Sequence, residues 1–308
     1  MRYLLLIILF GGSLLHTQAQ SGSLTPEGRE KLEAYEDTLQ VLSVIMVTDS
    51  IEKNRFAAVR KMIPTLVEVL KTPNSFQYPF EKLRSISIQY DPDSTFRIFT
   101  WQLYVDSENY RYYGAIQKNT SELSLFPLID RSFEISSPVN ANALPPEQWY
   151  GALYYKLMPL DHPDGPRYLM LGYDQYSLYR RRKVMDVLYF DEEGTPRFGD
   201  PIIPVAGDRK LNRLVLEYSA EAKVRLNYDP SLELIVFDHL IQIDGRFGEG
   251  KVNVPDGSYQ AFRIENGQLQ FVDKVFEQVS AEPLMQDSTL LQGRRSDRDL
   301  FGRKKGGN

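Results

Sequence analysis

Two histidines and their acidic neighbours are the residues with the clearest capacity for chemistry. His162 lies between Asp161 and Asp164, and an imidazole beside carboxylates can act as an acid–base group or a metal ligand. Pro and Gly complete the same run, however, and that composition is typical of a turn. His239 lies in an apolar stretch without the spacing of a metal-binding helix. We therefore predict no catalytic residue, no metal and no cofactor, and keep Asp161, His162 and Asp164 as the catalytic candidates to test first.

Other catalytic signatures are absent from the sequence. There is no cysteine, which excludes thiol nucleophiles, iron–sulfur clusters and Cys-based zinc sites. No Gly-x-Ser-x-Gly motif occurs, and the glycines of 245–250 match neither a phosphate-binding loop nor a dinucleotide motif. Carboxylates are numerous, and a hydrolase needs two of them about 5–10 Å apart in a cleft. A hydrolase that depends on Asp and Glu is therefore the enzymatic alternative.

Aromatic residues are abundant, with 19 Tyr, 16 Phe and two Trp. Tyrosines cluster in three regions, and a basic run at 180–183 follows the last of them. Aromatic rings can form a binding platform for a glycan or peptide, and arginines can hold an anion. The same residue types also pair across strands and fill cores, which is the interpretation we favour. If a platform exists, its candidate residues are Tyr112, Trp149, Tyr155, Tyr173 and Arg181.

The first nineteen residues have the pattern of a signal peptide. Arg2 precedes an apolar run from Leu4 to Leu15, and the segment from Thr17 to Ala19 offers small residues for cleavage. The run is shorter than the ~20 residues that a membrane-spanning helix needs, and no later stretch is long enough. We expect cleavage after Ala19, an exported mature chain and no transmembrane helix.

Charge is distributed unevenly along the chain. The formal net charge is −5, yet the segment 293–308 holds six Lys and Arg against two Asp. The acidic remainder would repel phosphate, so we predict no binding of nucleic acid. We expect the basic tail at 283–308 to be disordered, with a weak charge contact to an anionic surface as its one candidate role.

The hydrophobic pattern changes once along the chain. Apolar residues recur every three to four positions up to about residue 80 and close to every two from about residue 84. Thr25 and Pro26 predict the start of a first helix. Asp49 and Ser50 predict the cap of a second helix, in which Pro64 should produce a kink.

Strand patterns separated by turn signals fill most of the remaining sequence. The strongest turn signal is Asn266-Gly267, because both positions tolerate positive φ. Consecutive strands without helices between them indicate antiparallel sheets, here of about 10–12 strands. We predict an α+β fold with a signal peptide at 1–19, a helical hairpin at 20–80, an antiparallel β domain at 81–282 with a second boundary near 136–146, and the tail at 283–308.

Several short segments resemble an uncharacterised family of exported, periplasmic proteins from Bacteroidota. They are YRYYGAIQ at 110–117, ALYYKL at 152–157, LMLGYD at 169–174, VLYFD at 187–191 and PDGSY at 255–259. The resemblance implies a periplasmic location. It brings no site residues, because no activity is attached to that family.

These observations lead to one hypothesis and two alternatives. The hypothesis is a non-enzymatic periplasmic protein that binds an envelope protein or a glycan. The first alternative is a secreted Asp/Glu-dependent hydrolase. The second is an outer-membrane β-barrel, which the number of predicted strands suggests.

Overall fold

The computed structural model describes residues 22–135, 142–205, 209–245 and 250–275. Over these ranges two N-terminal α-helices precede a series of strands whose ladders are all antiparallel, which confirms the predicted α+β class. The predicted signal peptide and basic tail lie outside the described residues. In the described part of the chain, no helix combines the length and apolar character needed to cross a membrane.

The helical hairpin consists of α1 (Pro26–Thr48) and α2 (Glu52–Leu70). The predicted start of α1 is confirmed, because the Thr25 hydroxyl accepts a hydrogen bond from the Gly28 N–H at 3.0 Å. The predicted cap of α2 is wrong by one or two residues. The N-cap is Ile51, whose own N–H donates to the Asp49 carboxylate at 2.7 Å. α2 continues without interruption through Pro64, whose side chain is exposed.

Three larger sheets and one small one follow the hairpin. The first sheet has the order β1-β2-β3-β4 and contains β1 (Ser87–Tyr90), β2 (Phe96–Asp106), β3 (Asn109–Lys118) and β4 (Leu125–Ile129). The second has the order β11-β7-β6-β5, with β8 on β7, and contains β5 (Leu153–His162), β6 (Gly165–Asp174), β7 (Arg180–Phe190), β8 (Pro196–Phe198) and β11 (Arg213–Ser219). The third has the order β12-β13-β14-β15 and contains β12 (Leu226–Asp229), β13 (Leu234–Asp244), β14 (Lys251–Glu265) and β15 (Gln268–Val272). The fourth pairs β9 (Ile203–Val205) with β10 (Arg209–Leu211).

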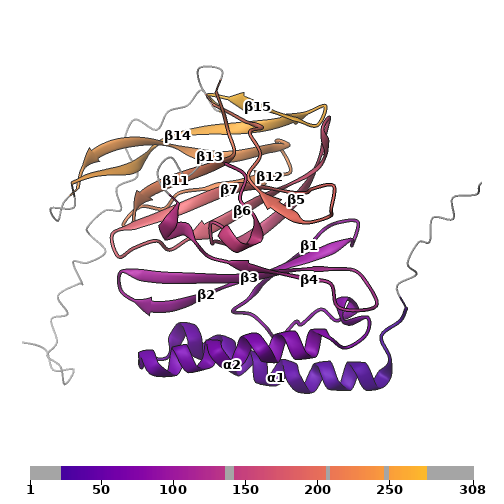
Figure 1. Ribbon diagram of the computed structural model, residues 1–308. Coiled ribbons are helices and arrows are strands. Elements are labelled where there is room, and N and C mark those ends of the chain that lie inside the picture. Colours follow the sequence, from indigo (N-terminus) through magenta and orange to yellow (C-terminus); the bar gives the residue numbers. More distant parts are fainter. Residues whose placement is uncertain (1–21, 136–141, 206–208, 246–249, 276–308) are drawn as a thin grey trace, which may run out of the picture.

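The helices and the three larger sheets are stacked in layers, with the helices at one end and the third sheet at the other (Figure 1). Each junction has its own apolar core. Met62 and Trp101 belong to the core between the helices and the first sheet, and Trp149 and Val184 to the core between the first and second sheets. Phe237 belongs to the core between the second and third sheets. The first sheet ends with β4 and the second begins with β5, and the predicted boundary near 136–146 falls in the sequence between them, partly outside the described residues.

The turn between β14 and β15 matches its prediction, since Asn266 and Gly267 have φ values of 50° and 72°. The short strands β8, β9 and β10 were missed, because three residues are too few to show an alternating pattern. Asp256-Gly257 has the composition of a turn, but it lies inside β14. It is an irregularity inside the strand, where the register against β13 shifts opposite His239.

Candidate functional site

Two buried arginines fasten the helical hairpin to a single strand of the first sheet. Arg55 of α2 donates to the carbonyl oxygens of Tyr104 and Val105 at the end of β2, both at 2.6 Å. Arg97 of β2 donates to the carbonyl oxygen of Tyr78, just after the hairpin, at 2.6 Å. The two helices therefore pack over β2. This placement leaves the helix-side surface of β3 and β4 only partly covered.

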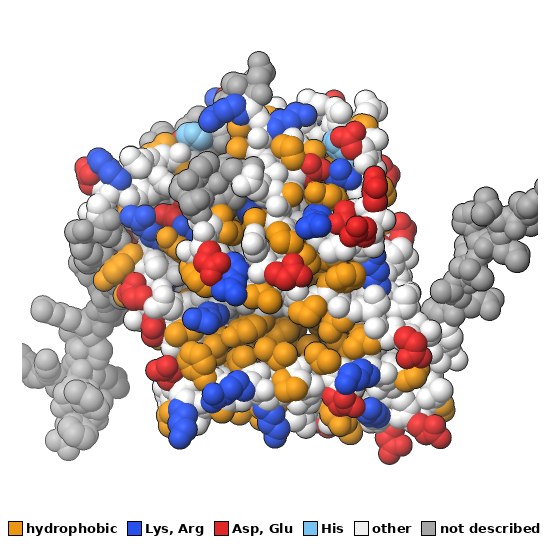
Figure 2. Space-filling model, viewed as in Figure 1, with side chains coloured by type: hydrophobic (Ala, Val, Ile, Leu, Met, Phe, Trp, Pro, Cys, Tyr) orange, Lys and Arg blue, Asp and Glu red, His pale blue; other side chains and the backbone are white. Residues whose placement is uncertain are grey.

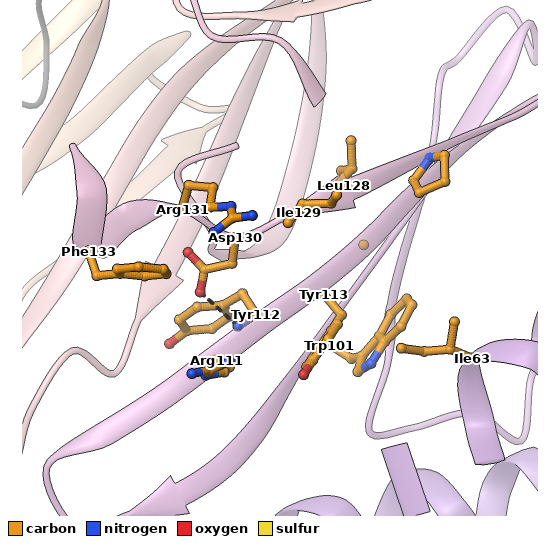
Figure 3. Close-up of a pocket in the computed structure, with 12 residues that line it drawn as sticks. Ile63, Trp101, Arg111, Tyr112, Tyr113, Leu128, Ile129, Asp130, Arg131 and Phe133 are labelled. Carbon is orange, nitrogen blue, oxygen red and sulfur yellow. Dashed lines mark hydrogen bonds between the residues drawn. The ribbon is translucent and has the colours of Figure 1, made fainter. Parts of the chain in front are cut away.

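An apolar groove occupies that uncovered surface, with a volume of about 400 Å³. On the face shown in Figure 2, hydrophobic side chains gather in a hollowed band next to the helices. Figure 3 shows the groove between α2 on one side and the end of β4 on the other. The residues that line it are Ile63, Trp101, Arg111, Tyr112, Tyr113, Gly114, Pro127, Leu128, Ile129, Asp130, Arg131 and Phe133.

The floor and walls of the groove are formed by a few large apolar side chains. Trp101 and Tyr113 are cross-strand neighbours on β2 and β3, and their rings stack with centroids 6.0 Å apart. Ile63 of α2 forms one wall. Ile129 and Phe133 lie on the opposite side and are 45% and 71% exposed. Large apolar side chains this exposed are candidates for ligand contact.

The indole N–H of Trp101 is a polar group in this apolar surrounding, without a hydrogen-bond partner among the described residues. Trp101 is 3% exposed, and no acceptor among the described residues bonds to its Nε1. A buried donor of this kind has lost its hydrogen bonds to water without gaining one in the protein, which is energetically unfavourable. Trp101 is also one of only two tryptophans in the chain, so it can report directly on what enters the groove.

One end of the groove is charged, and Asp130 organises it. One carboxylate oxygen accepts the N–H of Tyr112 at 3.0 Å, and the other accepts the N–H and hydroxyl of Ser132 at 2.9 and 2.7 Å. Burial raises the pKa of Asp130, and these hydrogen bonds oppose that rise. Both oxygens therefore serve internal donors.

Two arginines lie beside this carboxylate at the same end of the groove (Figure 3). Arg131 pairs with Glu134 at 2.8 Å. Arg111 is exposed, and within the described ranges no carboxylate or carbonyl oxygen forms an ion pair or hydrogen bond with it. The groove thus has an apolar floor at one end, and at the other an exposed arginine that interacts electrostatically with Asp130.

Two of the predicted platform residues are buried between the first and second sheets. Tyr112 is 2% exposed, and its hydroxyl accepts the N–H of Gln175 at 2.6 Å. Trp149 is fully buried and donates from Nε1 to the Tyr154 hydroxyl at 3.0 Å. Both fill the core, and of the two only Tyr112 also borders the groove.

The other three predicted platform residues lie elsewhere, on the second sheet. The ammonium of Lys183 lies over the rings of Tyr155 and Tyr173, at 4.7 and 5.3 Å from their centroids. Arg181 donates to the carbonyl oxygens of Gln175 and Ser177, which fixes the loop before β7. The five residues therefore do not form one surface.

The three catalytic candidates lie at the tip of the β5–β6 hairpin, as the turn composition predicts. Nδ1 of His162 accepts the N–H of Asp164 at 3.2 Å, and the Asp164 side chain is 79% exposed. The described residues contain no group of three side chains suited to hold a metal. His239 pairs separately with Asp256 at 2.8 Å.

Charged side chains buried in the core were missed by the sequence analysis. Asp186 and Arg213 form an ion pair at 2.8 Å with both side chains fully buried. Burial also raises the pKa of Asp174 to about 6, while Arg182 nearby opposes the rise. These groups lie inside the protein and hold the second sheet together, so we do not assign them to a site.

Apart from Tyr112, the groove residues were missed as well, for a different reason. Ile63 belongs to the apolar stripe of α2, and a stripe does not show which of its members face a core and which face an opening. Comparison with known proteins gives no match: no family model, no curated protein and no solved structure is similar to this chain. The candidate site therefore rests on its geometry.

Proposed function

We propose that this chain is an exported, non-enzymatic binding protein that takes up an apolar ligand in the groove between the helical hairpin and the edge of the first sheet. The observation that carries the proposal is the groove itself, with its stacked Trp101 and Tyr113 floor and a volume of about 400 Å³. Small-molecule sites are typically clefts of about 300–1,000 Å³ with mostly apolar linings and a few polar groups.

The way the hairpin is fastened supports this function. Because Arg55 attaches α2 to the end of β2, and Arg97 attaches the segment just after the hairpin to the start of β2, the groove exists without a ligand. A preformed site avoids the cost of ordering its walls when the ligand binds. The lining also favours an apolar group over a sugar. Of the expected envelope partners, we therefore retain those that present an apolar group and set the glycan aside.

Export to the periplasm is part of the proposal and is supported by the N-terminal sequence pattern. The hydrolase alternative has less support. Its candidates Asp161, His162 and Asp164 lie at a hairpin tip, where the Asp164 carboxylate is 79% exposed. Catalytic carboxylates, by contrast, are usually placed in a cleft.

Titration with a neutral apolar dye such as N-phenyl-1-naphthylamine tests the proposed function. We expect saturable fluorescence enhancement in the native protein and at least a tenfold weaker affinity in Ile129→Glu. The matched control is Ile241→Glu, another partly exposed isoleucine, 38% exposed, on β13, which should bind as the native protein does. Absence of saturable binding, or equal losses in both variants, would contradict the proposal.

A further inference from the structure

We infer that the groove binds a single-chain amphiphile with an anionic head group, with the head at Arg111 and the chain along Trp101 and Ile63. The inference rests on the proposed function and adds the chemical class of the ligand. It follows from the distribution of charge at one end of the groove and of apolar surface at the other.

At the charged end, Arg111 is the cationic side chain that is placed to bind a ligand. Asp130 has both oxygens engaged by Tyr112 and Ser132, and Arg131 is paired with Glu134. Arg111 lines the groove and is exposed; it interacts electrostatically with Asp130, but forms no ion pair or hydrogen bond among the residues that the structure describes. An anionic group placed there would gain charge-assisted hydrogen bonds from the guanidinium.

The opposite end has apolar surface to cover. Trp101 and Ile63 line it, and Figure 3 shows both away from the two arginines. Burial of this surface by an alkyl chain is favourable because it removes apolar area from water on both sides. A ligand that satisfies both ends is apolar along its length and negative at one tip, as a long-chain carboxylate is.

Quenching of tryptophan fluorescence by a fatty acid that carries a nitroxide on its chain tests the position of the chain. Trp149→Phe leaves only Trp101, at the groove, and Trp101→Phe leaves only the buried Trp149. We expect strong, saturable quenching in Trp149→Phe and little in Trp101→Phe, at concentrations below micelle formation. If Trp149→Phe does not fold, the quenching of Trp101 is obtained as the difference in quenching between the native protein and Trp101→Phe.

Competition of this probe by unlabelled compounds tests the head group. In this competition, the affinity of a fatty acid should be at least ten times higher than that of the alcohol of the same chain length. Arg111→Gln should remove that preference while the affinity for the alcohol stays within twofold. Arg263→Gln is the matched control, because its guanidinium is exposed and paired with Glu265 on β14, outside the groove lining, and it should keep the preference.

The possible outcomes separate the inference from the proposed function. Equal affinity for acid and alcohol, or equal losses for both in Arg111→Gln, would overturn the anionic head group and leave the apolar groove intact. If no nitroxide-labelled fatty acid quenches Trp101, both the inferred ligand class and the proposed function are overturned. A protein dimer that dissociates in Phe133→Asp would also overturn both, since a second copy would then occupy the groove.

Discussion

Arg97 donates from its guanidinium to the carbonyl oxygen of Tyr78 at 2.6 Å, and its other hydrogen-bond partners are also neutral groups. Further donors reach the Gln117 amide oxygen at 2.8 Å and the Tyr90 hydroxyl at 2.7 Å. The Phe99 ring centroid lies 4.7 Å from the guanidinium carbon. A fully buried cation is thus stabilised by oxygens and ring faces, and burial lowers its pKa.

Arg97→Lys should destabilise the protein strongly. A lysine ammonium has no planar fork with which to reach these separate acceptors, and several would be left buried without a donor. We expect a loss of about 3 kcal/mol or more in the free energy of unfolding, measured by chemical denaturation. Arg263→Lys is the control, because its side chain is 52% exposed, and it should change stability by less than about 0.5 kcal/mol. Similar losses in both variants would argue against this role of Arg97.

Gly267→Ala should cost much more stability than Gly250→Ala. Both glycines have positive φ, at 72° and 75°, so both substitutions carry backbone strain of about 1 kcal/mol. An added Cβ at Gly267 would lie 1.8 Å from the carbonyl oxygen of Asp161, whereas one at Gly250 meets nothing within 4 Å. Thermal melting of the two variants measures the difference, and equal melting temperatures would mean that the two hairpin tips are not in contact.

Removing one partner of the buried Asp186–Arg213 pair should be worse than removing both. A single Asp186→Ala leaves a fully buried arginine without its carboxylate, for an expected loss of about 3–5 kcal/mol. The double variant Asp186→Leu with Arg213→Met leaves no buried charge at this position and should lose less. A double-mutant cycle in denaturant, with Asp186→Leu and Arg213→Met as its single variants, gives the coupling energy, and additive losses would show that the pair is not coupled.

Stability should depend on pH through Asp174. Its folded-state pKa of about 6 lies above the ordinary value of 3.8, mainly because of burial. The folded state therefore favours the protonated carboxyl, and this contribution is complete below about pH 4 and lost as the pH rises through 6. Asp174→Asn keeps a neutral group, so its stability relative to the native protein should improve by about 3 kcal/mol between pH 4 and pH 7.5. The same offset at both pH values would show that Asp174 does not titrate in this range.

The parts of the fold that follow from local chemistry were predictable from sequence. Thr25 and Pro26 start α1 as expected, and Asn266-Gly267 forms the expected tight turn, because each depends only on backbone conformation and hydrogen bonds within a few residues. The class of fold followed from the change of hydrophobic period together with the turn signals between consecutive strands.

The groove was not predictable, because it depends on contacts between distant segments. Its position is set by Arg55 and Arg97. The acceptors of Arg55 are backbone carbonyls, and Arg97 bonds two more, those of Tyr78 and Ser75. Arg55 reaches Tyr104 across 49 positions of sequence. A carbonyl acceptor has no signature in sequence. Ile63 looked like a core residue, and only the docking of the hairpin on β2 leaves it at an opening.

Asp130 lies where a fourth strand would otherwise continue along β3. β4 ends at Ile129, which pairs with Tyr113, and the next N–H of β3 is met by the Asp130 side chain instead of by a carbonyl. The backbone of Asp130 meanwhile forms a bridge with Trp149 of the following segment. One carboxylate thus stands in for a missing stretch of strand, so the chain can turn away while the hydrogen-bond ladder stays complete. The opening in the surface is therefore obtained without leaving the edge of β3 unsatisfied at the point where the sheet stops.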